Sequence, residues 1–292
     1  MRQFDVPEID YDRYTNRQLA AVPLAVLAVA LAVVIGWWVF TGAPATLGID
    51  FAGGTELTIE TTDDRSTIEG AFNEEVENIR TTGTSNQYIL EFRSDDAEGI
   101  EQQAEADLTP ANGNDDVVQE ASTFSASFGG DNQRTALYGI VIAFVGMGTL
   151  AFALFRTFVP SIAIVISAFS DIVIPVAVMN VLGIPLSLGT VAGLLMLIGY
   201  SVDSDILLNN HVLRRSGDFY ESTYRAMQTG VTMTVTSMSA MAVLTVVAYI
   251  FGIGILWQIG LVLVVGLLAD LMNTYMLNLS LLRWYKFEGI NR

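Results

Sequence analysis

Six blocks of this 292-residue chain are apolar over a length that crosses a lipid bilayer. A helix needs about 20 consecutive apolar residues to span the roughly 30 Å of hydrocarbon. The blocks are residues 19–40, 136–155, 160–182, 186–208, 230–251 and 256–282. They predict a polytopic α-helical membrane protein with six transmembrane helices. The first block is too long for the apolar part of a signal peptide, so we expect a retained anchor.

Acidic residues are concentrated between the first two blocks. Residues 42–133 hold 20 acidic residues and three arginines, which accounts for the whole formal net charge of −17 and leaves the remainder balanced. An acidic solvated surface suits high salt, where screening suppresses repulsion between like charges. We therefore expect a halophilic source, and the alternative is an acidic surface that only aids solubility.

Residues 42–134 have the patterns of a small α+β domain between the first two spans. Its predicted elements are a strand at 56–60, a capped helix at 66–79, a strand at 87–93, a helix at 97–108 and a last strand from Val117. In the first of these helices, Ile68, Phe72, Val76 and Ile79 share one face by their spacing. The predicted order is therefore β-α-β-α-β.

Basic residues in the short loops predict the orientation of the spans, because they remain on the cytoplasmic side. They occur before the first span and after every second crossing, at Arg13, Arg17, Arg156, Arg214, Arg215, Arg225, Arg283 and Lys286. The predicted organisation is a cytoplasmic N-terminus at 1–18, the first span at 19–41, an acidic extracytoplasmic domain at 42–134, five further spans within 135–282 and a cytoplasmic tail at 283–292. The predicted location is the cell membrane, with both termini inside.

Four aspartates lie within the apolar blocks, at Asp171, Asp203, Asp205 and Asp270. A carboxylate inside a bilayer costs several kcal/mol unless a partner, a cavity or a proton accompanies it, so each is a candidate functional group. We expect Asp171 and Asp270 near mid-depth, and Asp203 and Asp205 nearer the cytoplasm. Residues two apart on a helix are about 200° apart, so Asp203 and Asp205 mark two polar faces.

Hydroxyl groups could accompany these carboxylates. Ser201 shares a helix stripe with Asp205, and the fifth span repeats Thr232 and Thr236 at a spacing of four. Such hydroxyls can serve a neighbouring aspartate or a file of water, and the alternative is that they bond carbonyls of their own helix. The candidate ion path or polar network is Asp171, Asp203, Asp205, Asp270, Ser201, Thr232 and Thr236.

The chain has no cysteine and a single histidine, His211. This composition excludes disulfides, thiol nucleophiles and Cys-based metal sites, and it leaves no second histidine for a zinc motif. The adjacent Gly53 and Gly54 are not followed by the Lys-Ser/Thr of a phosphate loop. We therefore expect no metal, no cofactor and no bound nucleotide.

Two motifs resemble a known family. Residues 47–55 read Leu-Gly-Ile-Asp-Phe-Ala-Gly-Gly-Thr and resemble the Gly-Ile-Asp-Phe-x-Gly-Gly signature of the SecD/SecF translocase subunits. Residues 198–203 read Ile-Gly-Tyr-Ser-Val-Asp and resemble the Ile-Gly-Tyr-Ser-x-Asn-Asp motif of the fourth span. The chain length and the single short insert favour the SecF branch. The signature residues Gly48, Asp50, Gly53 and Gly54 are expected to form a hinge or a base for the domain, because glycine permits a bend or close backbone approach.

The resemblance implies a SecD partner in a unit of the RND superfamily that assists export of unfolded polypeptides through the SecY channel, within the lipid bilayer. It also implies a subunit that is not an enzyme and that has no nucleic acid partner. In bacterial members, proton movement is thought to drive the external domains. Aligned on the fourth-span motif, the proton-linked Asp of the family falls on Ser204, and its fifth-span Arg falls near Thr232. The bacterial proton path therefore does not carry over residue by residue. Two alternatives stay open, a subunit of a small-molecule exporter and a scaffold subunit without an ion path.

Overall fold

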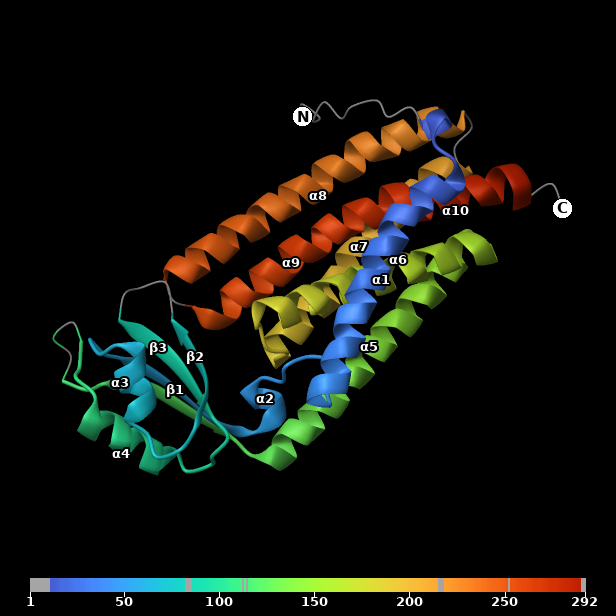
Figure 1. Cartoon of the computed structure of the whole chain (residues 1–292). Helices are drawn as coiled ribbons and strands as arrows, with labels where there is room; N and C mark the ends of the chain where they lie inside the picture. Colours follow the sequence, from blue (N-terminus) through green and yellow to red (C-terminus); the bar gives the residue numbers. More distant parts are fainter. Residues whose placement is uncertain are drawn as a thin grey trace.

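Among the residues that the structure describes, six long apolar helices form the membrane part, which confirms the predicted fold class. The computed structural model describes residues 11–81, 86–111, 113, 115–214, 218–251 and 253–289, so Arg215 lies outside the described residues. The helices are α1 (Asn16–Thr41), α5 (Ala126–Phe155), α6 (Phe158–Leu182), α7 (Leu188–Arg214), α8 (Phe219–Ile250) and a sixth that runs through α9 (Gly254–Met272), η2 (Asn273–Asn278), α10 (Leu279–Trp284) and η3 (Tyr285–Gly289). Figure 1 shows the helices as one bundle with a small sheet domain at one end.

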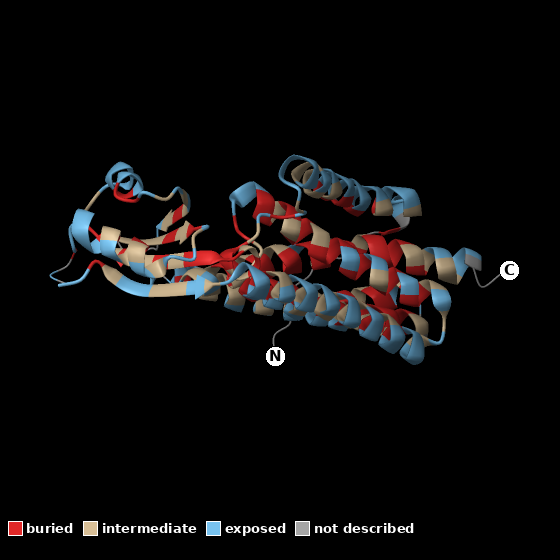
Figure 2. Ribbon diagram, turned by 90° about the horizontal axis from the view of Figure 1, so that it is seen from below, coloured by how far each residue is buried: buried red, intermediate tan, exposed pale blue. Residues whose placement is uncertain are grey.

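The helices α6, α7 and α9 form the centre of the bundle. In the most apolar 18-residue stretch of α6, 61% of the residues are buried. The corresponding share is 11% in α5 and 11% in α8. Figure 2 shows the same division, with buried residues inside the bundle and exposed residues along the outer helices. Glycines allow close packing at the centre, because a Cβ on Gly189 would lie 2.5 Å from Ile255 and one on Gly266 would lie 2.2 Å from Leu197. Polar residues on α6, α7 and α9 are therefore shielded by protein.

Basic residues join the ends of the first and last helices. The short 3-10 turn η1 (Tyr11–Arg13) precedes α1. Arg283 Nη1 donates hydrogen bonds to the carbonyl oxygens of Tyr11 (3.0 Å) and Tyr14 (2.8 Å), and Lys286 Nζ donates to the carbonyl oxygen of Val212 (3.1 Å). The described parts of the chain before α1 and after α10 therefore lie together, at the end of the bundle away from the sheet (Figure 1).

The described part of the domain after α1 is a four-stranded antiparallel sheet with two helices. Its elements are β1 (Gly54–Glu60), α3 (Arg65–Gly70), β2 (Val76–Thr81), β3 (Gln87–Phe92), α4 (Ala97–Asp107) and β4 (Val118–Phe124). The strand order is β2-β3-β1-β4, which is the arrangement of a ferredoxin-like β-α-β-β-α-β unit. Its core contains Leu57, Ile59, Ile68, Leu90 and Ile100, all fully buried. The sequence predicted the α+β class and omitted one strand.

The predicted helix at 66–79 is confirmed only as far as Gly70, and the rest of the prediction is wrong. The helix α3 ends at Gly70, and Val76 begins the strand β2. A β-bulge between Val76 and Asn78 inserts one residue into the strand. Because of this extra residue, Val76 and Ile79 both pack on the core although they are three residues apart. The bulge therefore gave Val76 and Ile79 the three-residue spacing that is typical of one face of a helix.

Candidate functional site: an intramembrane carboxylate network

Three of the four predicted aspartates meet in the middle of the bundle. Asp171 lies on α6, Asp205 on α7 and Asp270 on α9, and their exposed fractions are 1%, 0% and 1%. Asp203 is exposed, on another side of α7 from Asp205. The predicted division of this pair between two faces of one helix is therefore confirmed.

Asp171 is held by side chains from two neighbouring helices. Ser201 Oγ donates a hydrogen bond to Asp171 Oδ2 (2.6 Å), and Asn273 Nδ2 donates to Asp171 Oδ1 (2.6 Å). Ser201, on α7, is thus bonded to a carboxylate of the neighbouring helix α6 and not to Asp205 of its own helix. Each oxygen of Asp171 has a donor, as a buried polar group requires.

Asp205 and Asp270 share one threonine hydroxyl. Thr274 Oγ1 lies 3.0 Å from Asp205 Oδ1 and 3.2 Å from Asp270 Oδ1. Asn278 Nδ2 donates to Asp205 Oδ1 (2.7 Å), and Ser204 Oγ lies 2.8 and 3.0 Å from the two oxygens of Asp270. Thr274 and Asn278 follow Asp270 by four and eight residues along the sixth span, in the direction away from the sheet domain, so Asp205 lies nearer that end of the bundle than Asp270, in the order that the sequence predicts.

We call this set the carboxylate network, and its members are Asp171, Asp205, Asp270, Ser201, Ser204, Asn273, Thr274 and Asn278. The sequence has no arginine or lysine between Arg156 and Arg214 or between Arg225 and Arg283. The spans that carry the network therefore contain no permanent cation to balance three carboxylates. The oxygens and nitrogens are in direct hydrogen-bond contact at 2.6–3.2 Å. A proton can be carried within hydrogen bonds of this length, because it needs no cavity of its own between the two atoms.

Three members of the carboxylate network lie on η2, a π-helical segment of the sixth span. They are Asn273, Thr274 and Asn278. Turns of this wider kind are rare and occur mostly as single turns, often at functional sites. We did not predict these residues from the sequence. The signal that could have revealed them is the presence of three amide and hydroxyl side chains within six residues of an apolar block.

The fifth-span threonines do not belong to the carboxylate network. Thr232 Oγ1 donates to the carbonyl oxygen of Gln228 (2.6 Å), and Thr236 Oγ1 donates to that of Thr232 (2.7 Å). These hydroxyls therefore bond their own helix, as the alternative interpretation stated.

A small cavity connects the carboxylate network with the side of the bundle. It has a volume of about 100 Å³, and its lining includes Tyr200, Asp203, Ser204, Gly230 and Thr234 from α7 and α8. Ser204 is the only member of the carboxylate network among the residues that line it. Asp203 therefore lies beside the carboxylate network without a hydrogen bond to it among the described residues.

The glycine signature forms the junction between the domain and the bundle. It contains the short helix α2 (Ile49–Ala52). The N–H of Gly48 donates to the carbonyl oxygen of Leu186 (2.8 Å), and Asn180 Nδ2 donates to that of Pro44 (2.9 Å). On the other side of α2, Gln133 Nε2 of α5 donates to the carbonyl oxygen of Phe51 (2.7 Å). Because the signature is bonded on two sides, these contacts favour a fixed base for the domain over a hinge between the domain and the bundle.

Asp50 of the signature caps the helix that carries Asp205. Its Oδ2 accepts a hydrogen bond from the N–H of Leu188 (2.6 Å), the first residue of α7. Ser187 and Thr190 bond each other's backbone N–H in a reciprocal cap (2.8 and 3.1 Å). The first N–H groups of a helix have no partner within it, and an acid there also interacts favourably with the helix dipole. The junction and the carboxylate network thus share α7.

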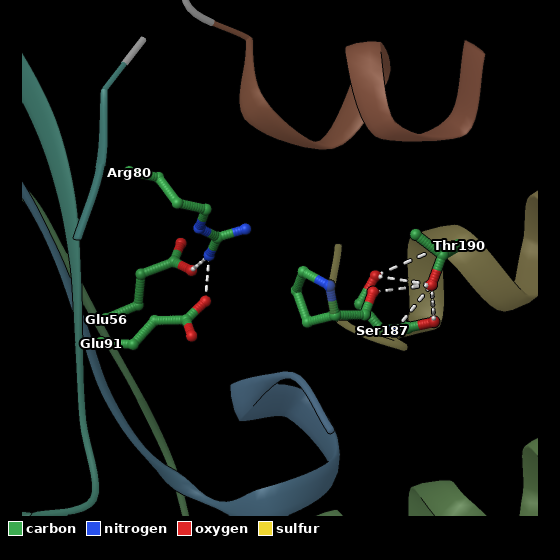
Figure 3. Close-up of polar contacts among 6 residues, drawn as sticks. Glu56, Arg80, Glu91, Ser187 and Thr190 are labelled. Atoms are coloured by element: carbon green, nitrogen blue, oxygen red, sulfur yellow. Dashed lines mark hydrogen bonds and ion pairs between the residues drawn. The ribbon is translucent and has the colours of Figure 1, made fainter. Parts of the chain in front are cut away.

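A half-buried charge cluster faces this cap from the sheet. Arg80 Nη2 contacts Glu91, and it lies 3.4 Å from Glu56 Oε2. The three residues come from β1, β2 and β3, and they face Ser187 and Thr190 across a gap in Figure 3. The gap is a cavity of about 170 Å³ whose lining also includes Asp50 and Gln258. Burial raises the pKa of Asp50, Glu56 and Glu91 above their ordinary values.

Acidification is expected to stabilise this junction. A carboxyl whose pKa is higher in the folded than in the unfolded state contributes stability that is full below the unfolded pKa and is lost as pH rises through the folded pKa. At constant high salt, the midpoint of thermal unfolding should therefore rise as the pH falls from about 7 towards about 5. Glu91→Gln should flatten this dependence, whereas Glu98→Gln, at an exposed position of α4, should retain it. An equally steep dependence in Glu91→Gln would contradict the assignment.

The chain matches known proteins over its whole length. Residues 104–288 match the family described as protein export membrane protein SecD/SecF, C-terminal, and residues 38–64 match the SecD/SecF GG motif. A protein-export membrane protein SecF from Haloferax volcanii is 62% identical over 292 residues, with 100% of both chains covered. A SecF from Haloquadratum walsbyi is 60% identical over 294 residues, again with 100% of both covered. The expectation of a halophilic source agrees with these two organisms.

A solved structure has the same fold. The crystal structure of SecDF, a translocon-associated membrane protein from Thermus thermophilus, has a TM-score of 0.74 and 19% sequence identity, and the match covers 98% of this chain. This chain spans 40% of that longer chain. From the matched motif, the C-terminal region and the relatives that align end to end, the chain belongs to the SecF family of protein-export membrane proteins.

Proposed function

We propose that the chain is an accessory subunit, not an enzyme, that pairs with SecD and assists export of unfolded polypeptides through the SecY channel, with protons moving through the carboxylate network. The observation that carries the proton part is a set of three buried aspartates, each hydrogen-bonded to hydroxyl or amide side chains, on spans without arginine or lysine. The names of the relatives support the export part, because they are protein-export membrane proteins. The SecDF protein of similar fold is translocon-associated, which supports an association of this chain with the translocon.

The proposed mechanism links the carboxylate network to the domain through α7. Adding a proton to Asp205 or removing one changes which hydrogen bonds Thr274 and Asn278 can form. A shift between α7 and the sixth helix then reaches Leu188, whose N–H is bonded to Asp50. Asp50 lies in α2, and the first strand of the domain begins at Gly54, two residues after α2 ends, so movement of α7 is passed to the domain that would contact the exported chain. A two-state element that both sites bias is the physical requirement for such coupling.

We expect copurification to distinguish this function from that of a small-molecule exporter. Affinity purification from native membranes in high salt should recover SecD and SecY with the chain, and depletion of the chain should lower the amount of secreted protein. Recovery of a homotrimer without SecD or SecY would favour the small-molecule exporter. Normal secretion after depletion would argue against an export function.

The proposed orientation has the termini in the cytoplasm and the acidic domain outside. The chain has no cysteine, so single cysteines report position without background. Asp115→Cys in the domain should react with a membrane-impermeant maleimide on intact cells, whereas Glu288→Cys should react only after the membrane is opened. Both positions are exposed, so access to the reagent depends on sidedness alone. The reverse pattern would overturn the orientation.

A further inference from the structure

We infer that the Thr274 hydroxyl passes protons between Asp270 and Asp205, and that Ser204 connects Asp270 to the cavity between α7 and α8. The inference rests on the proposed use of protons and names the route inside the carboxylate network. It adds a hydroxyl relay on the sixth span to the four aspartates that the sequence predicts as candidates.

The position of Thr274 is that of a bridge. Its Oγ1 lies 3.2 Å from Asp270 Oδ1 on the preceding turn of its own helix and 3.0 Å from Asp205 Oδ1 on α7. The residue is fully buried, as is Asp205, and Asp270 is 1% exposed. A hydroxyl has one hydrogen and two acceptor sites, so it can receive a proton from one carboxyl while donating its own to the other.

The other membrane threonines show why this contact is unusual. The hydroxyls of Thr232, Thr236 and Thr245 each donate to a carbonyl four residues earlier in α8, at 2.6–2.7 Å. A hydroxyl that is bonded in this way is not available to a neighbouring acid. Thr274 instead lies in the π-helical segment η2, and its hydroxyl contacts only side-chain oxygens of Asp205, Asp270 and Ser204 among the described residues. Its hydroxyl is therefore free to turn between the two acids.

The transfer balances without another reactant. The proton of the Asp270 carboxyl moves to Thr274 Oγ1 as the hydroxyl proton of Thr274 moves to Asp205 Oδ1. Asp270 becomes a carboxylate, Asp205 becomes a neutral carboxylic acid, and Thr274 remains a neutral alcohol. Rotation of its O–H bond then returns the relay to its starting arrangement.

Ser204 supplies the connection of this relay to the cavity. Its Oγ lies 2.8 and 3.0 Å from the oxygens of Asp270 and 3.2 Å from Thr274 Oγ1. Ser204 also lines the cavity of about 100 Å³, whose lining includes the exposed Asp203. A proton that enters between α7 and α8 therefore meets Ser204 before Asp270. The route runs from the cavity through Ser204, Asp270 and Thr274 to Asp205.

The test compares threonine variants in the complex copurified with SecD, reconstituted at high salt into vesicles that contain a pH-sensitive dye. Thr274→Val keeps the branched shape and removes the hydroxyl, and we expect proton influx after an acid jump to fall at least about tenfold. Thr274→Ser keeps the hydroxyl and should remain within about threefold of the parent. Thr236→Val is the matched control, because its hydroxyl bonds its own helix, and it should leave proton influx unchanged.

A second readout separates proton transfer from packing. The parent and Thr274→Ser should conduct more slowly in D₂O than in H₂O, and the residual flux of Thr274→Val should lose this isotope dependence. If Thr274→Val does not assemble with SecD, then Thr274→Ala, which adds no bulk, replaces it in the same comparison.

The outcomes distinguish the relay from the proposed function. If Asp270→Asn stops proton influx while Thr274→Val conducts normally, the relay is overturned and the proton function stands. If Asp270→Asn and Thr274→Val both conduct normally, the proposed proton use itself fails. Loss of flux in Thr274→Val with retention in Thr274→Ser and Thr236→Val supports the relay.

Discussion

Replacing Asp270 with asparagine is expected to lower secretion at least about tenfold, since an amide cannot take up or release the proton that a carboxyl carries. Asparagine keeps the size of aspartate, and its oxygen still accepts from Ser204 or Thr274. The variant should therefore accumulate in the membrane and copurify with SecD at the parent level. Secretion of a reporter protein, normalised to the amount of assembled complex, measures the effect.

The same substitution at the other aspartates tests the remaining alternative. Asp171→Asn and Asp205→Asn should also impair secretion, because both residues are buried members of the carboxylate network. Asp131→Asn is the control, at an exposed position of α5 outside the carboxylate network and the cavity, and it should stay within about twofold. Normal secretion by the Asp171, Asp205 and Asp270 variants would favour a scaffold without an ion path.

Gly54→Ala is expected to destabilise the domain by about 2–6 kcal/mol, the sum of two effects. Gly54 has φ of 126°, a conformation that residues with a side chain rarely adopt. A Cβ at this position would also lie 2.1 Å from the carbonyl oxygen of Phe92, so the first residue of β1 could not keep its place beside β3. Backbone strain and overpacking each cost about 1–3 kcal/mol.

Limited proteolysis of the purified protein at high salt measures this change, because cleavage of the domain follows its opening. Gly70→Ala is the matched control within the same domain. A Cβ at Gly70 would meet nothing within 4 Å, and the residue ends α3 with an ordinary backbone conformation. Gly70→Ala should therefore be neutral or up to about 1 kcal/mol stabilising. Equal protease resistance of the Gly54 variant and the parent would contradict the role of Gly54.

The spans could be predicted because the length of an apolar block depends on local sequence alone. The strands of the domain were harder to predict from the sequence, since Val76 and Ile79 share a face only through a bulge that forms against β3. In the same way, the contact of Arg80 with Glu56 and Glu91 depends on the order of three strands. Such pairing is set by contacts between distant segments, and a sequence pattern does not reveal it.

The candidate site could be predicted only in part, because local sequence reveals a polar residue in an apolar block but not its partner on another helix. The cost of a carboxylate in lipid predicted that the aspartates have companions, and Ser201 was correctly selected as a polar neighbour on α7. Its actual partner, Asp171, lies on another helix. The roles of Asn273, Thr274 and Asn278 depend on the π-helical form of η2, which changes the direction of each side chain relative to an ordinary helix. Neither the helix propensity of these residues nor the spacing of apolar residues around them predicts a π-helical segment.

The contacts that fasten the acidic domain to the bundle have a consequence for life in brine. At about 1 M salt the screening length is about 3 Å, so attractions between surface ions contribute little. Apart from the bond between the Asp50 carboxylate and the N–H of Leu188, the fastening uses neutral amide donors and backbone carbonyls, as in the bonds from Asn180 to Pro44 and from Gln133 to Phe51. Dissolved ions do not weaken such bonds in this way. A mechanical linkage built mainly from uncharged groups can therefore transmit force in a solvent that would loosen one built from ion pairs.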